Sequence, residues 1–308
     1  MDLYKGLNIV VVVPCYNEEA TIGTVIDDIK SINPEFAIYI VDNNSTDNTA
    51  KIAVAHGANV LYERKQGKAY AVRKAFRELD FDIYVMVDGD NTYPLNKINE
   101  LIQPIVDGKA DMTIGDRHAS GCYRKNNKRK FHGFGNGLVK YTINLLFKAK
   151  LNDILSGYRA FNRSFVKNYP VVCDGFEIEA DLTIHALHYH YSIIDIPVSY
   201  QDRPHGSHSK LNTIRDGFKI LWLIFKLYKD TKPLRFFTSL SFVTFAIALG
   251  GGWVVVAEFL ESHFITHVPL AILSSSSLLL SFIFLTSGLI LDTLVKNDKK
   301  SHIIRVLA

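Results

Sequence analysis

The chain has 308 residues, of which 35 are basic and 31 acidic, so its formal net charge is only +4. This length allows one large domain or two ordinary ones, and so mild a charge gives no indication of nucleic-acid binding. Cys15, Cys122 and Cys173 are too few and too scattered for a disulfide framework or a zinc site, which favours a reduced, cytosolic setting for the soluble part.

Residues 1–209 alternate strand and helix patterns. Strands are predicted over 9–13, 37–41, 59–62, 83–87 and 111–114, and helices over 19–31, 47–56, 68–79 and 95–106. Alternation of this kind predicts an α/β domain with a mostly parallel sheet flanked by helices. Ligands of such sheets bind beyond the carboxyl ends of the strands. A later helical stretch contains His185, His188 and His190, which we expect at a surface.

Asp88-Gly89-Asp90 follows the mostly apolar run from Phe81 to Val87. Two carboxylates one residue apart at the end of a strand can share one divalent cation, and Mg²⁺ prefers a few carboxylates together with water and substrate phosphates. A metal held there can neutralise a departing diphosphate. For the motif alone, a polar turn that closes the strand is an equally good explanation.

Two other strand ends carry polar groups that would meet the same edge. Pro14 to Glu19 follows the first predicted strand, and Asp42 to Asp47 follows the second. Carboxylates such as Glu18 and Asp42 accept hydrogen bonds from the hydroxyl and N–H groups of a ribose or a base. The three strand ends together predict one ligand site.

A basic run comes next along the chain. Between residues 117 and 130 there is no acid, and the basic residues are Arg117, Arg124, Lys125, Lys128, Arg129 and Lys130. Guanidinium groups bind phosphate in a fork, so the run suits an anionic ligand. For any single lysine, a solvated loop or attraction to anionic lipid headgroups is as good an explanation.

Residues 210–232 are predicted to form an amphipathic juxtamembrane helix. Apolar residues recur at helical spacing, at Ile214, Phe218, Leu221, Trp222 and Phe225. Such a helix can lie in the headgroup layer of a membrane. Packing of the helix on the soluble domain is the alternative.

Residues 233–295 are predicted to form a transmembrane hairpin. Residues 236–257 are uncharged and extend about 33 Å as a helix, enough to cross a bilayer core, and residues 268–291 form a second uncharged span. The connector has no Lys or Arg, whereas basic residues lie on the other side of both spans, at Lys226, Lys229, Lys232, Arg235, Lys296, Lys299, Lys300 and Arg305. This asymmetry predicts an integral membrane protein with both termini, residues 1–232 and the basic tail 296–308 in the cytoplasm. A buried helical pair in a soluble core is the alternative.

Small residues lie inside both spans, at 250–252 and 274–277. They can permit close helix packing within the hairpin or between subunits, and the sequence does not separate the two. A homo-oligomer is therefore one possible state.

Taken in order, these motifs resemble those of the family 2 glycosyltransferases of GT-A fold. The resemblance covers about residues 8–230 and rests on the segments 12–19, 41–47, 87–90, 115–117, 153–159 and 203–211. They are most similar to the branch that loads a sugar onto a polyprenyl phosphate, and the two-helix membrane tail also fits that branch. The resemblance implies an inverting hexosyltransferase that uses a nucleoside-diphosphate sugar, UDP- or GDP-linked, with Mg²⁺ or Mn²⁺, to make a polyprenyl-phosphate sugar for glycan or cell-envelope modification.

The resemblance also implies roles for individual residues. The donor is expected to contact Pro14, Tyr16, Glu18, Asp42, Asp88 and Gly89, with Asp88 and Asp90 at the metal and with Arg203 and Lys210 clamping the diphosphate from a mobile loop. Some relatives carry a further metal-ligating Gln two residues after the second Asp. This chain has Thr92 there, so a hydroxyl or a water would complete the metal shell.

The acceptor determines what the remaining residues must do. A phosphate monoester is already ionised near neutral pH because its second pKa is about 6, whereas a hydroxyl acceptor needs a general base. We expect Arg117, then Arg129 and Arg124, to hold the acceptor phosphate, and Asp153 to position the reacting groups or to act as base for a hydroxyl. Glu177 and Glu179 could contact sugar hydroxyls or could simply lie at a helix N-terminus.

Two alternatives remain. A processive membrane polysaccharide synthase of the same fold generally shows a Gln-x-x-Arg-Trp motif, but Trp222 and Trp253 are the only tryptophans here and neither follows Arg. A non-catalytic membrane scaffold is disfavoured because both carboxylates of the Asp-x-Asp motif, Arg203 and Lys210 are all present.

Overall fold

The computed structural model describes most of the chain, and it divides into two compact units, Met1–Ile224 and Phe225–Ala308. The described residues are 4, 6–119, 132–170, 173, 175, 177–199, 221, 222, 224–226 and 228–307, without the side chains of 132–135, 305 and 307. The predicted site residues Arg124, Arg129, Arg203 and Lys210 lie outside the described residues, as does most of the predicted juxtamembrane helix. Residues 221, 222, 224–226 and 228–231 of that segment are helical.

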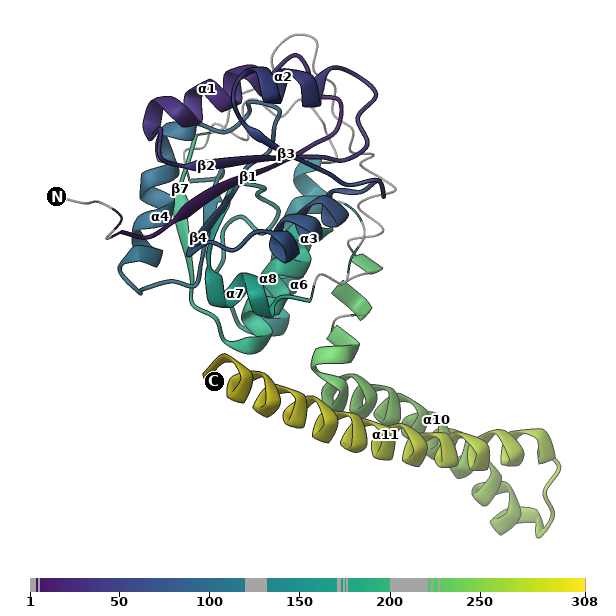
Figure 1. Ribbon diagram of the computed structural model, residues 1–308. Coiled ribbons are helices and arrows are strands. Elements are labelled where there is room, and N and C mark those ends of the chain that lie inside the picture. The colour runs from purple at the N-terminus through teal and green to yellow at the C-terminus, as the bar shows by residue number, and fades with distance from the viewer. Residues whose placement is uncertain are drawn as a thin grey trace. The chain divides into compact units, whose positions relative to one another are not determined.

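The first unit contains a seven-stranded sheet with the order β3-β2-β1-β4-β6-β5-β7 (Figure 1). Its strands are β1 Ile9–Cys15, β2 Ala37–Asp42, β3 Asn59–Tyr62, β4 Ile83–Met86, β5 Met112–Asp116, β6 Arg159–Asn162 and β7 Ile193–Pro197. Only β6 runs antiparallel to its neighbours, β4 and β5. The prediction of a mostly parallel sheet flanked by helices is therefore confirmed.

Helices cover both faces of the sheet. They are α1 Ile22–Ile32, α2 Thr49–Ala55, α3 Lys68–Glu78, α4 Ile98–Val106 after the 3₁₀ turn η1 Leu95–Lys97, α6 His132–Phe147, α7 Arg163–Asn168 and α8 Ile178–Tyr189. Alternate residues of β1 point into two cores. Val11 and Val13 pack with apolar residues of α1 and α4, whereas Val10 and Val12 pack with apolar residues of α3, α7 and α8. Since β1 is buried on both faces, it reads as an almost unbroken apolar run.

One surface prediction is wrong for two of its three residues, since only His190 is exposed. His185 and His188 on α8 are buried rather than exposed. The ring of His185 packs against aromatic rings, with centroid distances of 5.6 Å to Phe165 and 5.0 Å to Tyr169. This helix is enclosed almost all round, so its pattern carries no polar face from which an outer side could be read.

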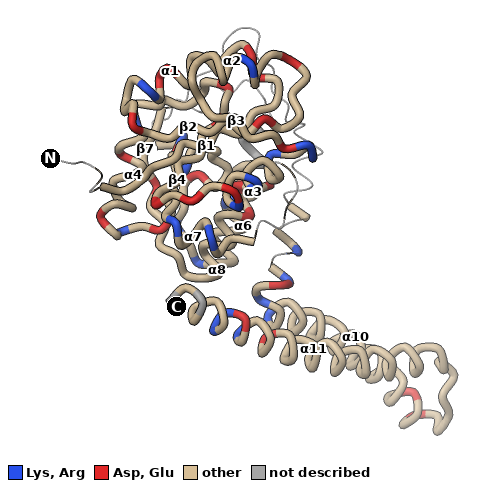
Figure 2. The backbone as a smooth tube through the Cα atoms, in the orientation of Figure 1, with Lys and Arg blue, Asp and Glu red and all other residues tan. Residues whose placement is uncertain are grey.

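The second unit is a hairpin of two long helices, α10 Pro233–Ser262 and α11 Val268–Leu307. Both are long and apolar enough to cross a membrane, with mean hydropathies of 2.0 and 2.1 in their most apolar windows. Only 17% and 11% of those windows is buried, which does not fit a buried pair in a soluble core. Figure 2 shows that the charged residues of the hairpin lie toward its two ends and leave the middle of both helices uncharged.

Small residues bring α10 and α11 together within the hairpin. A β-carbon on Gly251 would clash with the hydroxyl of Ser274, and one on Gly288 would lie 3.0 Å from the β-carbon of Phe237. One turn further, Ser241 Oγ donates a hydrogen bond of 2.9 Å to the Ser281 carbonyl. Of the two roles that the sequence left open, the structure shows packing within the hairpin.

Candidate functional site

Three turns at the carboxyl ends of β1, β2 and β4 form the edge where the sequence predicts a ligand site. Each turn contains an asparagine with a positive φ, namely 53° at Asn17, 64° at Asn44 and 56° at Asn91. Asn is one of the few residues that adopt this left-handed conformation readily. The three asparagines therefore let the chain turn sharply after each strand.

The first two turns are bonded to each other. The Asn17 amide donates to Ser45 Oγ at 3.0 Å, and the Glu18 amide donates to Thr49 Oγ1 at 2.8 Å. Asp42 is buried at the end of β2, where it pairs in register with Cys15. The structure thus brings together, at one edge of the sheet, the residues after β1 and β2 that are predicted to contact the nucleoside.

The third turn packs directly on the first. Thr21 Oγ1 donates a 2.6 Å hydrogen bond to the Gly89 carbonyl. A β-carbon on Gly89 would lie only 2.7 Å from Cys15 Sγ and 3.7 Å from Glu18 Cγ. Glycine at this position is what allows the turn that carries Asp88 and Asp90 to come so close to the first turn.

Asp88 forms an ion pair with Lys68, the first residue of α3. Lys68 Nζ lies 2.5 Å from Asp88 Oδ1 and also 2.5 Å from Glu179 Oε1 on α8. Burial would lower the pKa of Lys68, but the two facing carboxylates outweigh it and raise the pKa above its ordinary value. A buried cation therefore links the Asp88 turn to the first turn of α8.

Asp90 is oriented by Thr92. The Thr92 hydroxyl donates to Asp90 Oδ1 at 2.6 Å, and the Thr92 amide donates to the same oxygen at 3.2 Å. Asp90 is buried. Thr92, which stands where some relatives have Gln, thus donates two hydrogen bonds to the Asp90 carboxylate in this structure.

The carboxylates at the end of β4 fit a metal that is shared with substrate. Gly157 packs so closely on Asp88 that a β-carbon there would clash with Asp88 Oδ2, yet 28% of the Asp88 side chain is still exposed. Among the described residues, no group of three or more His, Cys, Asp or Glu side chains could hold a metal. Two carboxylates without a full protein cage are what Mg²⁺ uses when substrate phosphates supply further ligands.

Arg117 and Asp153 form a buried bidentate pair beside this edge. Arg117 Nε lies 2.6 Å from Asp153 Oδ2, and Arg117 Nη2 lies 2.9 Å from Asp153 Oδ1. Burial acts to raise the pKa of Asp153, but the Arg117 guanidinium overrides it and holds the pKa below its ordinary value. Asp153 is therefore ionised and a weak base, and Arg117 is held in one orientation.

Tyr93 joins the two halves of the site. Its hydroxyl accepts a 3.0 Å hydrogen bond from the amide of Gly157, the residue that faces Asp88. Burial raises the pKa of Tyr93, and the charges of Arg117, Asp88 and Asp153 act on the same hydroxyl. The Asp88 carboxylate and the Arg117–Asp153 pair thus both act electrostatically on the buried hydroxyl of Tyr93.

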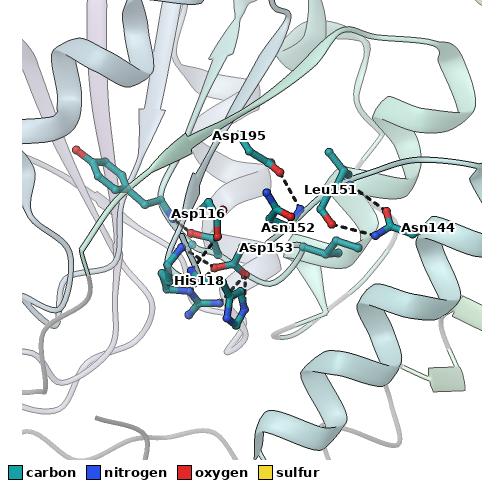
Figure 3. A network of polar contacts seen from close by, with 12 residues as sticks. Asp116, His118, Asn144, Leu151, Asn152, Asp153 and Asp195 are labelled. Atoms are coloured by element: carbon teal, nitrogen blue, oxygen red, sulfur yellow. Dashed lines mark hydrogen bonds and ion pairs between the residues drawn. The ribbon is translucent and has the colours of Figure 1, made fainter. Parts of the chain in front are cut away.

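The segment from Leu151 to Asp153 is held by polar contacts from two other elements (Figure 3). Asn144 on α6 exchanges two hydrogen bonds with the backbone of Leu151, of 2.9 and 3.1 Å. Asp195 Oδ2 on β7 accepts from the Asn152 amide at 2.7 Å. These contacts place Asp153 where Arg117 can meet it.

Arg159, which is fully buried, secures the rest of that segment. Its Nε donates to the Ser156 carbonyl at 2.9 Å, Nη2 to the Ile154 carbonyl at 2.6 Å and Nη1 to Thr183 Oγ1 at 3.0 Å. Burial lowers the pKa of Arg159 from its ordinary value, while the charge of Glu179 opposes the shift. The guanidinium serves here to fix backbone rather than to bind a ligand.

Sequence reasoning missed three of these residues: Lys68, Tyr93 and Arg159. Lys68 had a signal, because Gly67-Lys68 begins the helix after β3 at the same edge of the sheet as the other motifs. Tyr93 acts through a contact distant in sequence, with Gly157. Arg159 bonds mostly to the nearby carbonyls of Ile154 and Ser156, but no local pattern shows that its guanidinium turns back onto that backbone.

Comparison with known proteins places the chain in a family. The family model described as "Glycosyl transferase family 2" matches residues 10–169. A glycosyltransferase of Haloferax volcanii, AglJ, is 31% identical over 92% of this chain and 93% of its own length. The chain belongs to glycosyl transferase family 2. It is therefore a transferase of the hexosyltransferase class.

Other family 2 relatives act on lipid carriers according to their names. The dolichyl-phosphate hexose transferase of Haloferax volcanii is 29% identical, with 71% of this chain and 93% of that protein covered. The polyprenol monophosphomannose synthase of Mycolicibacterium smegmatis is 24% identical, with 64% and 78% covered. These relatives are consistent with the polyprenyl-phosphate-sugar branch of family 2.

The fold of the first unit is also similar to solved structures of another enzyme. Glucosyl-3-phosphoglycerate synthase from Mycobacterium tuberculosis, in complex with Mn²⁺ and UDP-glucose, aligns with a TM-score of 0.53 and 25% identity over 66% of this chain and 74% of that one. In complex with Mn²⁺, UDP and phosphoglyceric acid it aligns with a TM-score of 0.59 and 22% identity, covering 73% and 80%. The likeness supports the GT-A type of architecture.

Proposed function

We propose that this family 2 enzyme transfers a hexose, with inversion, from a nucleoside-diphosphate sugar to a polyprenyl phosphate. The observation that carries the proposal is the set of groups around Tyr93, whose hydroxyl bonds Gly157 beside the partly exposed Asp88 and experiences the charges of Asp88, Arg117 and Asp153. The dolichyl-phosphate and polyprenol relatives support the lipid acceptor. The UDP-glucose and Mn²⁺ of a structural neighbour support the donor and a divalent metal.

The donor would bind along the carboxyl edge of β1, β2 and β4. Pro14, Tyr16, Glu18 and Asp42 would contact the nucleoside, and Arg203 and Lys210, outside the described residues, would clamp the diphosphate. Asp88 and Asp90 would hold Mg²⁺ or Mn²⁺, which neutralises charge on the leaving diphosphate when it is bound. Thr92 keeps Asp90 oriented for that role.

The acceptor phosphate would attack the anomeric carbon of the sugar with one of its oxygens, while the bond from that carbon to the diphosphate breaks. No proton has to be removed, because the phosphate is already ionised at neutral pH. The lowered pKa of Asp153 suits this chemistry, since the carboxylate holds Arg117 instead of serving as a base. Arg117, with Arg129 and Arg124 outside the described residues, would offset the charge of two facing anions.

The reaction would take place at the cytoplasmic face of the membrane. The hairpin α10–α11 would cross the bilayer, with the basic residues before α10 and toward the end of α11 on the cytoplasmic side. The same orientation would put residues 1–232 in the cytoplasm.

The direct test is a screen of UDP- and GDP-sugars against undecaprenyl and dolichyl phosphate in detergent, with Mg²⁺ or Mn²⁺ and a hydroxyl-bearing glycan as a second acceptor. We expect a mild-acid-labile glycolipid to form only with the lipid phosphate. Transfer to the hydroxyl acceptor alone would contradict the proposal.

Asp90→Ala tests the metal role within the same assay. We expect turnover to fall by at least about a hundredfold, the order seen when one stabiliser of developing charge is lost, while the circular dichroism spectrum stays unchanged. Asp28→Ala removes an exposed carboxylate of α1 and should leave turnover unchanged. Wild-type turnover in Asp90→Ala would remove Asp90 from the mechanism.

A further inference from the structure

The Asp88 carboxylate, which the proposed function gives to a divalent metal, already holds a cation that belongs to the chain. Lys68 Nζ lies 2.5 Å from Asp88 Oδ1 and 2.5 Å from Glu179 Oε1. Only 10% of the Lys68 side chain and 7% of the Glu179 side chain are exposed. The ammonium group is therefore enclosed between two carboxylates, one of which is a predicted metal ligand.

The remaining approaches to the two predicted metal ligands are narrow. Gly157 packs so closely on Asp88 that a β-carbon there would clash with Oδ2. Asp90 is buried, and Thr92 donates two hydrogen bonds to its Oδ1. The exposed part of Asp88, 28% of its side chain, is thus the more open approach for an ion that arrives from solvent.

A divalent ion at Asp88 has to compete with the Lys68 ammonium. Mg²⁺ lies about 2.0–2.1 Å from its carboxylate ligands, so an ion on Asp88 would be within a few ångströms of Lys68 Nζ. Like charges at such a separation repel strongly where water is largely excluded. Lys68 therefore lowers the affinity of Asp88 for a free divalent cation.

Glu179 allows Lys68 to give up Asp88 without being left unpaired. It lies in the first turn of α8, on a different element from either of the other two residues. A buried charge that loses its only partner is costly, but Lys68 keeps the Glu179 carboxylate when a metal takes Asp88. The three side chains can therefore change partners without exposing a charge.

We propose that Lys68 is an internal counter-ion that keeps Asp88 from binding a free divalent metal and makes metal binding depend on the nucleoside diphosphate. The diphosphate supplies further metal ligands, together with negative charge that offsets the repulsion between the metal and Lys68. The inference rests on the metal role proposed for Asp88 and Asp90. It does not depend on the sugar or on the acceptor.

Metal affinity can be measured on the full chain in detergent without any turnover. The probe is Mn²⁺, alone or with UDP or GDP, and free Mn²⁺ is followed by electron paramagnetic resonance. We expect the wild type to bind Mn²⁺ at least about tenfold more tightly with the nucleotide than without it. Lys68→Met should bind Mn²⁺ alone at least about tenfold more tightly than the wild type, because a neighbouring charge commonly changes proton binding to a carboxylate by ten- to a thousandfold.

Glu179→Gln distinguishes an exchange of charges from damage to the fold. Lys68 then has only Asp88 as its carboxylate partner, so Mn²⁺ with UDP should bind severalfold more weakly than to the wild type. The change is opposite in direction to that of Lys68→Met. Lys74→Met removes an equal charge further along α3, where Lys74 pairs with Glu78, and should leave the Mn²⁺ affinity unchanged.

The double variant Lys68→Met/Glu179→Gln provides a second measurement, because Lys68→Met alone is expected to be less stable. The double variant also lacks the ammonium group and should bind Mn²⁺ alone more tightly than the wild type. Thermal midpoints give an independent readout, since an ion that binds only the folded state raises the midpoint. Mn²⁺ alone should raise the midpoint of either Lys68 variant more than that of the wild type.

The possible failures separate this inference from the proposed function. If the wild type binds no Mn²⁺ even with UDP or GDP, the metal role of Asp88 and Asp90 is overturned together with the inference. If the wild type needs the nucleotide and both Lys68 variants bind Mn²⁺ alone equally weakly, only the inference is overturned. Tight binding of Mn²⁺ alone by the wild type, or a gain in Lys74→Met or Glu179→Gln, would overturn it as well.

Discussion

Lys68 is the residue on which the charge balance of the candidate site depends. It is the hydrogen-bonded cation between Asp88 and Glu179, and it lies where two buried or partly buried carboxylates would otherwise face each other. Removing one partner of a buried ion pair is costly because the remaining charges lose their compensation. Lys68 is therefore expected to stabilise the first unit before any ligand binds.

We expect Lys68→Met to destabilise the first unit by about 3 kcal/mol, near the lower end of the range for a broken buried pair because Asp88 is partly exposed. For a unit of this size that is a fall of roughly 6–12 °C in the thermal midpoint. The double variant Lys68→Met/Glu179→Gln should recover much of the loss, since it removes one of the stranded charges. A single variant as stable as the wild type would show that the pair contributes nothing.

Asp195 gives the first unit a pH dependence. Burial and the charges of Asp116 and Asp153 raise its pKa from 3.8 to about 6, against the Asn152 amide and Arg159. The folded state therefore binds this proton more tightly than the unfolded state. The contribution of Asp195 to stability falls as the pH rises through the window between these values, and the destabilisation is complete above about pH 6.

Asp195→Asn keeps an acceptor for the Asn152 amide and removes the charge. We expect the variant to have a higher thermal midpoint than the wild type at pH 8, and we expect the difference to disappear below about pH 3, where the wild-type carboxyl is largely neutral in both states. The measurement is the midpoint of both proteins across this range. A gain of the same size at both ends would point to packing instead of charge.

At the scale of elements, the segment between α6 and β6 sets the geometry of the site. It is fixed by Asn144 from α6, by Asp195 from β7 and by Arg159, and it ends with Gly157 against Asp88. Gly157 has no positive φ, so alanine is compatible with its backbone. Any effect of alanine there comes from the added methyl group.

Gly157→Ala should push the Asp88 carboxylate away from its present position. We expect about tenfold weaker binding of a nucleoside diphosphate with Mn²⁺, measured by calorimetry, and a loss of about 1–3 kcal/mol of stability from overpacking. Gly137→Ala on α6 meets open space and should leave binding unchanged. Equal binding by the two variants would show that Asp88 does not depend on Gly157.

The elements that the sequence predicts well are those with strong apolar patterns. The strands at 9–13, 37–41, 59–62 and 83–87 and the four helices between residues 19 and 106 appear within a few residues of their predicted positions. The strands β6 and β7 were not predicted. β6 begins with Arg159 and ends with Asn162, and β7 is only partly buried, so neither carries the apolar run by which a buried strand is identified.

The site could be predicted only where it follows from strand ends. Glu18, Asp42, Asp88 and Asp90 meet at one edge because parallel strands end there. The pairing of Arg117 with Asp153 was not predicted, since it depends on the antiparallel β6 and on the segment before it. The sequence indicated phosphate chemistry for Arg117 but could not show that a carboxylate holds it.

At the scale of the whole molecule, the chain combines two units that distribute their apolar residues in opposite ways. The first buries its apolar residues around a sheet, and the second exposes them along the hairpin, as its low burial shows. The uncharged windows predict membrane spans over residues 236–257 and 268–291, whereas the helices α10 and α11 extend beyond these ranges. The helices continue because charged side chains do not interrupt backbone hydrogen bonds. Pro233 and Pro269 lie in the first turns of α10 and α11, where proline is tolerated.

The hairpin offers a test of how independent the two units are. Gly251 contacts α11 so closely that a β-carbon would clash with Ser274, whereas its neighbour Gly250 meets open space. We expect Gly251→Leu to separate the helices and Gly250→Leu to leave them together. Ser241→Cys with Ser281→Cys reports the separation, because the two hydroxyls lie 3.1 Å apart and the cysteines should form a disulfide on mild oxidation.

In the Gly251→Leu background, the yield of that disulfide should fall severalfold. The free energy of unfolding of the first unit, followed through its thermal midpoint, should change by no more than about 0.5 kcal/mol, as expected for distant, independent sites. Gly250→Leu should change neither quantity. The chain forms each unit largely from its own contacts, so damage to the hairpin should stay within the hairpin. A loss of stability in the first unit that accompanies the loss of the disulfide would instead show that the fold of the first unit depends on the hairpin.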